Sequence, residues 1–335
     1  MLRRSARIGI AALAATALVG VGGCGEKEED ARGKPELEPF DVALDFYVNP
    51  DHAGIFTGLE RGDFAEAGLD VETQVPADPS APIRQVAAGR ADLAISYEPE
   101  VLLALDQGLP VRAVGALVDQ PLTSLISLPE AGIETPADLA GKTIATAGIP
   151  YQTAFLEAIL DGEGLRPEDV EQVDVGLGLL PAVLSGRADA MLGGFLNVEG
   201  VDLELRGKNP RVQPVDELGI PAYDELVLVA NADRIEEEPE PIRLFVAALE
   251  RGTQAAADDP EAATQAVLEA GEGLEPRLTG AEVERTLPLL RPSEGERFGY
   301  MDPREWRRFI AFMANEGLIA ARPDTEEALT NELLP

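Results

Sequence analysis

The stretch Val86-Ala-Ala-Gly-Arg-Ala-Asp-Leu-Ala-Ile95 is repeated as Val183-Leu-Ser-Gly-Arg-Ala-Asp-Ala-Met-Leu192, 97 residues further along the chain. Each copy is typical of a helix end, a glycine that terminates the helix, and the start of a strand. The same offset, to within two residues, relates two more pairs of glycines: Gly68 with Gly164, and Gly108 with Gly207. This repeat predicts two similar structural units in tandem. The alternative is a chance similarity between two α/β segments, and the agreement of three offsets argues against it.

Each unit is predicted to alternate strands with helices, starting from a strand at residues 42–46 in the first unit and at residues 143–147 in the second. Such alternation predicts a parallel α/β sheet in each unit. Two further apolar segments, residues 123–128 and 225–230, are interpreted as strands that cross between two lobes. We therefore expect residues 40–124 and 227–335 to form lobe 1, and residues 125–226 to form lobe 2.

The composition limits the function classes. The chain has 335 residues, enough for two domains, with 61 acidic against 27 basic residues and a net charge of −34. We expect no nucleic-acid binding, because that function needs a basic surface and this chain is strongly acidic. A single Cys and a single His argue against a disulfide framework, a Cys/His zinc site and a Cys–His nucleophile pair. We expect no metal site and no cofactor.

The N-terminus has the pattern of an export signal. Three arginines precede an apolar stretch at residues 8–21, and Val21-Gly-Gly-Cys24 follows it and resembles a bacterial lipobox. We expect a signal peptide at residues 1–23, a lipid on Cys24, and a flexible tether at residues 24–39. The alternatives are an ordinary signal peptide with a free thiol, or a short membrane anchor. The function is then exercised outside the cytoplasmic membrane, on its outer face.

Four loops at the carboxyl ends of predicted strands are candidates for a ligand site, because ligands of open α/β sheets bind there. They cover residues 45–52, 96–99, 146–153 and 193–199. Aromatic residues make up only 5% of the chain, yet several fall in or beside these loops: Phe46, Tyr47, Tyr97, Tyr151, Phe195 and Tyr223. The concentration favours a cleft for a planar ligand. For any one ring, packing that anchors its loop is an equal alternative.

The polar residues of these loops indicate the chemistry of the ligand. Asp45, Glu98 and Glu199 lie in or beside the loops without Lys or Arg, so the ligand is expected to carry hydrogen-bond donors. An anion stays open as an alternative, because the helix that starts near Gln152 presents backbone N–H groups. His52 has no partner at a spacing that indicates catalysis, and we expect no enzymatic activity.

Two segments carry a family resemblance: Leu44-Asp-Phe-Tyr-Val-Asn-Pro-Asp-His-Ala-Gly-Ile-Phe56 and Gly62-Asp-Phe-Ala-Glu-Ala-Gly-Leu-Asp-Val71. They resemble the substrate-binding lipoproteins of ABC importers with the type II periplasmic-binding-protein fold, and most closely the subgroup that binds thiamine-precursor pyrimidines. The resemblance covers about residues 40–320. It implies an α/β fold with two similar lobes joined by two crossing strands, a monomer, and an ABC permease with its ATPase as partners.

The resemblance also implies a set of site residues. Asp45, Asn49, His52 and Gly54 match the first-loop pattern of the subgroup, with Phe46 where Trp is common, and Glu199 matches an acidic position after the last strand of lobe 2. With the loop aromatics, the expected ligand-binding residues are Asp45, Phe46, Asn49, His52, Tyr97, Glu98, Gly148, Tyr151, Gln152, Asn197, Glu199 and Tyr223.

The expected function is capture of a flat heteroaromatic ligand, foremost a thiamine-precursor aminopyrimidine such as hydroxymethyl- or formylaminomethyl-pyrimidine, and its delivery to a membrane permease. One alternative is the same fold with another solute: a riboflavin-like ring, an alkanesulfonate or nitrate. Another is a pyrimidine synthase that consumes pyridoxal phosphate and a histidine, since the resemblance extends to such enzymes. A third is a sensor or scaffold lipoprotein without a permease.

Overall fold

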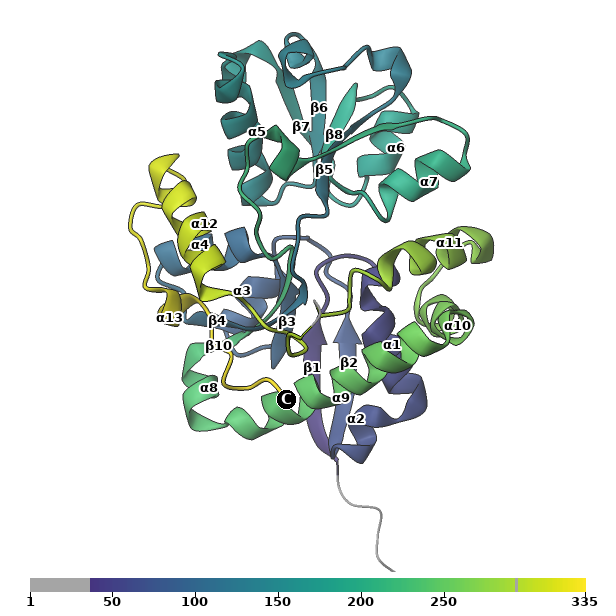
Figure 1. Ribbon diagram of the computed structural model, residues 1–335, viewed down its shortest axis with the longest axis vertical. Helices are drawn as coiled ribbons and strands as arrows, with labels where there is room; N and C mark the ends of the chain where they lie inside the picture. Colours follow the sequence, from purple (N-terminus) through teal and green to yellow (C-terminus); the bar gives the residue numbers. More distant parts are fainter. Residues whose placement is uncertain (1–36, 293–294) are drawn as a thin grey trace, which may run out of the picture. The chain divides into compact units, whose positions relative to one another are not determined.

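Two five-stranded sheets carry the fold (Figure 1). The computed structural model describes residues 37–292 and 295–335, and residues from Leu37 onward form one compact unit. The expected signal peptide, Cys24 and most of the expected tether lie outside the described residues. Sheet 1 has the order β2-β1-β3-β10-β4 and sheet 2 the order β7-β6-β8-β5-β9.

The strands of sheet 1 are β1 (Glu38–Ala43), β2 (Leu69–Gln74), β3 (Leu93–Ser96), β4 (Val111–Val118) and β10 (Leu226–Asn231). Those of sheet 2 are β5 (Thr123–Ser127), β6 (Thr143–Thr146), β7 (Glu171–Asp174), β8 (Ala190–Phe195) and β9 (Arg211–Pro214). The prediction of two similar α/β lobes is confirmed. We call the part of the chain around sheet 1 lobe 1 and the part around sheet 2 lobe 2.

The helices of lobe 1 are α1 (Ala53–Arg61), α2 (Asp63–Glu66), α3 (Pro82–Ala87), α4 (Glu98–Asp106), α8 (Ala232–Glu237), α9 (Pro239–Asp258), α10 (Pro260–Ala270), α11 (Pro276–Thr286), α12 (Pro303–Asn315) and α13 (Thr325–Ala328). Those of lobe 2 are α5 (Pro150–Gly162), α6 (Leu179–Leu184) and α7 (Glu199–Leu205). Short 3₁₀ turns are η1 (Pro50–His52), η2 (Pro129–Ala131), η3 (Pro136–Leu139), η4 (Pro167–Asp169) and η5 (Val215–Leu218). Of the helices described, none is both long and apolar enough to cross a bilayer.

The repeated Gly-Arg-Ala-Asp stretch has the same structural role in both lobes. Its aspartate accepts a hydrogen bond from a backbone N–H of the neighbouring strand: Asp92 from Asp41 in the middle of β1, and Asp189 from Thr143 at the start of β6. Each aspartate N–H donates back to the carbonyl of the same partner at 2.8 Å. The aspartate side chain is short, so it can make both hydrogen bonds with its partner residue only from one position next to the strand. This requirement explains why the stretch recurs in both lobes.

The sheets are mixed rather than purely parallel, so that prediction is wrong for one strand in each. β10 runs antiparallel to β3 and β4, and β5 runs antiparallel to β8 and β9. These are the strands that enter each sheet from the other lobe. The chain passes between lobes at residues 119–122 and 215–225, and each predicted crossing segment becomes the antiparallel strand of the sheet it enters.

Glu225 ties the two connections between the lobes together. Its fully buried carboxylate accepts hydrogen bonds from the backbone N–H groups of Leu122 and Thr123, both at 2.7 Å, from the Thr123 hydroxyl at 2.9 Å and from the Tyr223 hydroxyl at 2.9 Å. A carboxylate with four donors is well satisfied. The connections are thus held side by side where they leave the lobes.

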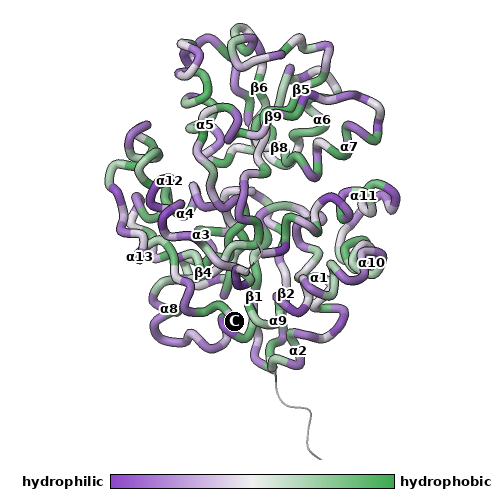
Figure 2. The backbone as a smooth tube through the Cα atoms, viewed as in Figure 1, coloured by the Kyte–Doolittle hydropathy of each residue, from purple (hydrophilic) through white to green (hydrophobic). Residues whose placement is uncertain are grey.

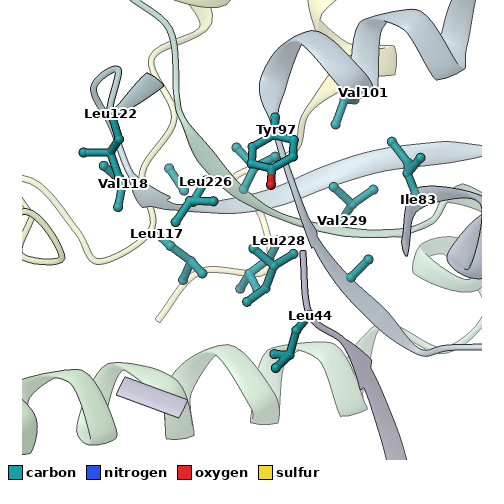
Figure 3. Close-up of a cluster of buried hydrophobic side chains, with 14 of the residues drawn as sticks. Leu44, Ile83, Tyr97, Val101, Leu117, Val118, Leu122, Leu226, Leu228 and Val229 are labelled. Atoms are coloured by element: carbon teal, nitrogen blue, oxygen red, sulfur yellow. The ribbon is translucent and has the colours of Figure 1, made fainter. Parts of the chain in front are cut away.

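The core of lobe 1 packs against the residues that lead into the ligand loops. The centre of sheet 1 is largely hydrophobic (Figure 2). Figure 3 shows Tyr97 among apolar side chains from β4, β10, α3 and α4: Ile83, Val101, Leu117, Val118, Leu226, Leu228 and Val229. Tyr97 is therefore anchored by its apolar ring while its hydroxyl is left for polar contacts.

Glycines bring α1 unusually close to α9. A Cβ at Gly252 on α9 would lie 2.3 Å from the Gly54 carbonyl oxygen, and one at Gly54 would lie 2.2 Å from Thr253 Oγ1. No side chain fits at either position. The close contact holds the start of α1, and with it the loop before η1, against the body of lobe 1.

Candidate functional site

A cavity with an empty volume of about 400 Å³ lies between residues of both lobes. We call it the interlobe cavity. The residues that line it are Asp45, Phe46, Tyr47, Asn49, Tyr97, Ala147, Ile149, Tyr151, Gln152, Gly193, Phe195, Val198 and Glu199.

The loop after β1 is shaped by local hydrogen bonds. The Asn49 side chain accepts from the Asp51 N–H at 2.8 Å and so caps η1, which begins with Pro50. The Asn49 amide also donates to the Tyr47 carbonyl at 3.1 Å, and the Asn49 N–H donates to His52 Nδ1 at 3.3 Å. This reciprocal cap is the reason for the three-residue spacing between Asn49 and His52.

Asp45 is the central acceptor of the cavity. It is 2% exposed, and its two oxygens accept hydrogen bonds from His52 Nε2 and from the Tyr97 hydroxyl, both at 2.8 Å. Because His52 Nδ1 already accepts a backbone N–H, the hydrogen-bond network assigns the proton to Nε2 and leaves the ring neutral. Burial and the Asp45 carboxylate hold the pKa of Tyr97 well above its usual value, so Tyr97 stays a donor. Both donors fix the Asp45 carboxylate in place.

Aromatic rings form much of the cavity wall. Phe46 and Tyr47 lie with their ring centroids 4.6 Å apart, and Tyr97 of lobe 1 meets Tyr151 of lobe 2 at 5.4 Å. The Tyr151 ring is fully buried. Flat, apolar walls with few polar groups suit a planar ring.

Glu199 is the acidic group that lobe 2 contributes. Its Oε2 accepts from the Phe195 N–H at 2.8 Å, and burial raises its pKa to about 7. Near neutral pH this carboxyl is therefore able either to accept or to donate a hydrogen bond. With Asp45, each lobe presents one acid to the cavity, and neither Lys nor Arg lines it.

Gly193 on β8 leaves the space that the Gln152 side chain occupies. Gln152 Oε1 accepts from the Ala147 N–H at 2.7 Å. Gly193 on β8 has φ of 109°, and a Cβ there would lie 2.1 Å from Gln152 Nε2. The site therefore requires glycine at this position for two reasons, the backbone conformation and the space that the Gln152 amide occupies.

We expect Gly193→Ala to lower the free energy of unfolding by about 1–3 kcal/mol and to weaken ligand binding about tenfold, because Gln152 must leave its position. The matched control is Gly186→Ala, which has φ of 71° with no atom within 4 Å of the added Cβ. It should cost only the backbone strain and leave binding unchanged. Urea unfolding and calorimetric titration measure both effects. Equal ligand affinity of the two variants would contradict a role for Gln152.

Seven of the twelve predicted site residues line the cavity: Asp45, Phe46, Asn49, Tyr97, Tyr151, Gln152 and Glu199. Five do not: His52, Glu98, Gly148, Asn197 and Tyr223. His52 lies behind Asp45, fully buried, and positions it. A Cβ at Gly148 would lie 2.5 Å from the Asp174 carboxylate, so this position serves packing.

Glu98 and Tyr223 support the connections between the lobes rather than the cavity. Glu98 Oε2 accepts from the Asp224 N–H at 2.8 Å. Burial, with Asp224 next to it, holds the pKa of Glu98 well above its usual value. Tyr223 donates to Glu225 and packs against Phe309. β3 ends at Ser96, two residues before Glu98. Glu98 is the first residue of α4 and does not line the cavity.

Asn197 joins the lobes beside the cavity. Its Nδ2 donates to Asp51 Oδ1 at 2.7 Å and to Thr286 Oγ1 at 2.8 Å, and both partners belong to lobe 1. Within the described residues, Asp51 Oδ2 and Asn197 Oδ1 are buried without a hydrogen-bond partner. Burial raises the pKa of Asp51 to about 8.

Six lining residues were not in the predicted set: Tyr47, Ala147, Ile149, Gly193, Phe195 and Val198. All lie within the predicted loops, and the two aromatic residues were noted there. The apolar residues carry no sequence signal that distinguishes a cavity wall from a core. In the described ranges, no group of three or more His, Cys, Asp or Glu side chains is arranged to hold a metal ion.

A family model described as NMT1/THI5 like matches residues 49–263. The chain belongs to the NMT1/THI5-like family. It is 36% identical over 281 residues to the formylaminopyrimidine-binding protein of Halalkalibacterium halodurans, with 83% of this chain and 85% of the relative covered. These findings confirm the family resemblance seen in the sequence.

More distant similarity extends to proteins named as enzymes. A 4-amino-5-hydroxymethyl-2-methylpyrimidine phosphate synthase of Legionella pneumophila is 26% identical over 297 residues, covering 88% of this chain and 92% of that protein. Among solved structures, the alkanesulfonate-binding protein SsuA of Xanthomonas axonopodis pv. citri, bound to MOPS, matches with a TM-score of 0.69 and 16% identity over 88% of this chain and 99% of that one. At this identity the structural match shows a shared two-lobe fold.

Proposed function

We propose that this chain is a solute-binding protein that holds an aminopyrimidine precursor of thiamine in the interlobe cavity and delivers it to an ABC permease and its ATPase. The observation that carries the proposal is the polar composition of the cavity: Asp45 from one lobe, Glu199 from the other, aromatic walls, and neither Lys nor Arg. The similarity to a formylaminopyrimidine-binding protein supports it.

The cavity chemistry matches an aminopyrimidine. The exocyclic amine donates to the Asp45 carboxylate, whose orientation is held by Tyr97 and His52. Ring nitrogens accept hydrogen bonds, and the Glu199 carboxyl, with its pKa near 7, supplies a proton on the opposite lobe. The faces of the ring pack on the tyrosines. A ligand joined to both lobes stabilises their contact, which is how a two-lobe binder couples capture to closure.

The proposed function also implies where the protein works in the cell. The protein works outside the cytoplasmic membrane, anchored on its outer face through a lipid on Cys24, as a monomer. The basic, apolar and Val21-Gly-Gly-Cys24 segments of the N-terminus support this. The tether of charged residues separates the lipid from the lobes.

The test is calorimetric titration with 4-amino-5-hydroxymethyl-2-methylpyrimidine, its formylaminomethyl analogue, riboflavin, an alkanesulfonate and nitrate. We expect the pyrimidines to bind with Kd of about 1 μM or below, and the others to bind far more weakly. Binding of only the sulfonate or nitrate would contradict the proposal. The single Trp306, whose Nε1 donates to Asp224 at 2.6 Å beside the connections, gives a fluorescence readout of the same event.

A synthase is the second candidate because the Legionella pneumophila relative is named as one. The residues present do not fit the pyridoxal phosphate chemistry that such an enzyme needs. The Lys142 ammonium group donates a hydrogen bond to the Ala131 carbonyl at 2.6 Å. Neither Lys142 nor Lys208 lines the interlobe cavity. His52 uses both ring nitrogens inside the fold. A visible absorption band after incubation with pyridoxal phosphate would support the synthase instead.

A further inference from the structure

A second cavity adjoins the first and has a different character. Its empty volume is about 670 Å³, and it shares Tyr47, Asn49, Val198 and Glu199 with the interlobe cavity. Its other walls come from α7, from α11 and the residues just before it, and from Val48, Pro50 and Leu180. We call it the acidic cavity, because four of its lining residues are acids: Glu199, Asp202, Glu275 and Glu282.

Three of the four acids already have partners. Asp202 forms a two-point ion pair with Arg206, which is the basic residue of this cavity. Glu275 caps α11 by accepting from the Leu278 N–H at 2.8 Å. Glu199 uses one oxygen on the Phe195 N–H. The Arg206 charge is therefore matched by Asp202, and no other Lys or Arg among the described residues lines this cavity.

Glu282 is the acid without a partner. Its side chain lines the acidic cavity and is only 6% exposed, and within the described ranges neither a hydrogen bond nor an ion pair is formed to it. Burial, together with Asp202, Glu199 and Asp51, raises its pKa to about 8. A ligand that donates a hydrogen bond in this cavity would give the Glu282 carboxyl a partner that it lacks among the described residues.

We propose that the acidic cavity is a subsite for a positively charged ammonium group on the side arm of the heteroaromatic ligand, with Glu282 as its principal acceptor. This inference rests on the proposed function of the interlobe cavity. The ring lies in the interlobe cavity, and its arm points toward Tyr47 and Glu199, two of the four residues that both cavities share. Carboxylates and a tyrosine face are the groups that hold an ammonium ion. A neutral hydroxymethyl arm leaves Glu282 without its partner.

The first test compares two ligands on the unmodified protein. We expect 4-amino-5-aminomethyl-2-methylpyrimidine, whose arm is an ammonium ion, to bind about tenfold more tightly than the neutral hydroxymethyl compound. Equal affinity, or a preference for the neutral arm, would overturn the inference while leaving the proposed function intact. If neither pyrimidine binds, both the inference and the proposed function fail.

The second test assigns the preference to Glu282. Glu282→Gln should remove the tenfold advantage of the ammonium compound and change the affinity for the hydroxymethyl compound by less than about threefold. Glu284→Gln is the matched control, since it makes the same charge change at an exposed position of α11 that lines neither cavity, and it should keep the advantage. An advantage that persists in Glu282→Gln would contradict the assignment. The two-ligand comparison stands even if that variant does not fold.

Discussion

Replacing Asp45 with asparagine should weaken aminopyrimidine binding by about 100-fold or more, which corresponds to about 2.7 kcal/mol. Asp45 accepts from both His52 and Tyr97, so its carboxylate is the fixed negative group of the cavity. An asparagine loses the charge. It also turns one oxygen into an N–H₂ group that faces a donor, which moves the side chain away from the orientation that the ligand amine needs.

Calorimetric titration with the hydroxymethyl pyrimidine measures this loss, and urea unfolding shows whether the variant is folded. Glu98→Gln serves as control, because it removes a buried carboxyl that lines no cavity, and its Kd should stay within about threefold of the original. An Asp45→Asn protein that binds as tightly as this control would refute the central role of Asp45.

The free energy of unfolding should fall by about 5 kcal/mol as the pH rises from about 5 to about 8, in contrast to many proteins. The cause is a set of buried carboxyls whose pKa values are raised to about 7 or 8, mainly by burial: Asp51, Glu100, Glu199, Asp224, Glu225 and Glu282. Burial shifts the ionisation equilibrium of each group toward its neutral form in the folded chain.

The sign follows from proton binding. Between the usual pKa of a carboxyl and its raised value, the folded chain holds more protons than the unfolded chain, so stability is greatest at low pH and decreases as the pH passes through this window. The acids with lowered pKa values, Asp78, Asp138 and Asp302, act only below about pH 4 and do not offset the trend.

Thermal unfolding monitored by circular dichroism between pH 5 and pH 8 measures the effect, and we expect Tm to drop by about 10 °C. The measurement should be made in about 1 M salt. Salt at this concentration screens the repulsion between the many surface acids but has little effect on the ionisation of the buried groups. A Tm that rises with pH under these conditions would contradict the prediction.

Asp51→Asn isolates one contributor. Asparagine cannot ionise, so it avoids the cost of charging this buried side chain, whose pKa is raised to about 8. The variant should therefore be more stable than the original at pH 8 and similar at pH 5. The control Asp70→Asn makes the same charge change at an exposed position and should leave the slope unaltered.

The repeat predicted the two lobes because its glycines and aspartates have local roles. Gly89 and Gly186 both adopt left-handed φ values, 65° and 71°, at the end of a helix. The aspartate three residues later pairs with the first strand in both lobes. Strand direction was not predictable in the same way. β5 and β10 are apolar segments like their neighbours, and only the path of the chain between lobes makes them antiparallel.

The sequence predicted which loops form the candidate site, but not which of their side chains face the cavity. Ligand loops follow strand ends by a general rule, and the scarcity of aromatic residues made those in the loops stand out. Which acids face the cavity was not predictable, because Asp45, Glu98 and Glu199 have the same side-chain chemistry and similar positions after strands. Glu98 instead bonds to Asp224, which is 126 residues away in the chain.

The sequence by itself determined the tandem α/β lobes and the family, since these depend on local patterns and on residue types. Only the tertiary structure decided that His52 positions Asp45 and that Asn197 joins Asp51 to Thr286. It also decided that Glu282, beside the interlobe cavity, has no partner among the described residues. The physical reason is that burial and hydrogen bonding of an ionisable group are set by segments far apart in the chain, and no spacing within one loop encodes them.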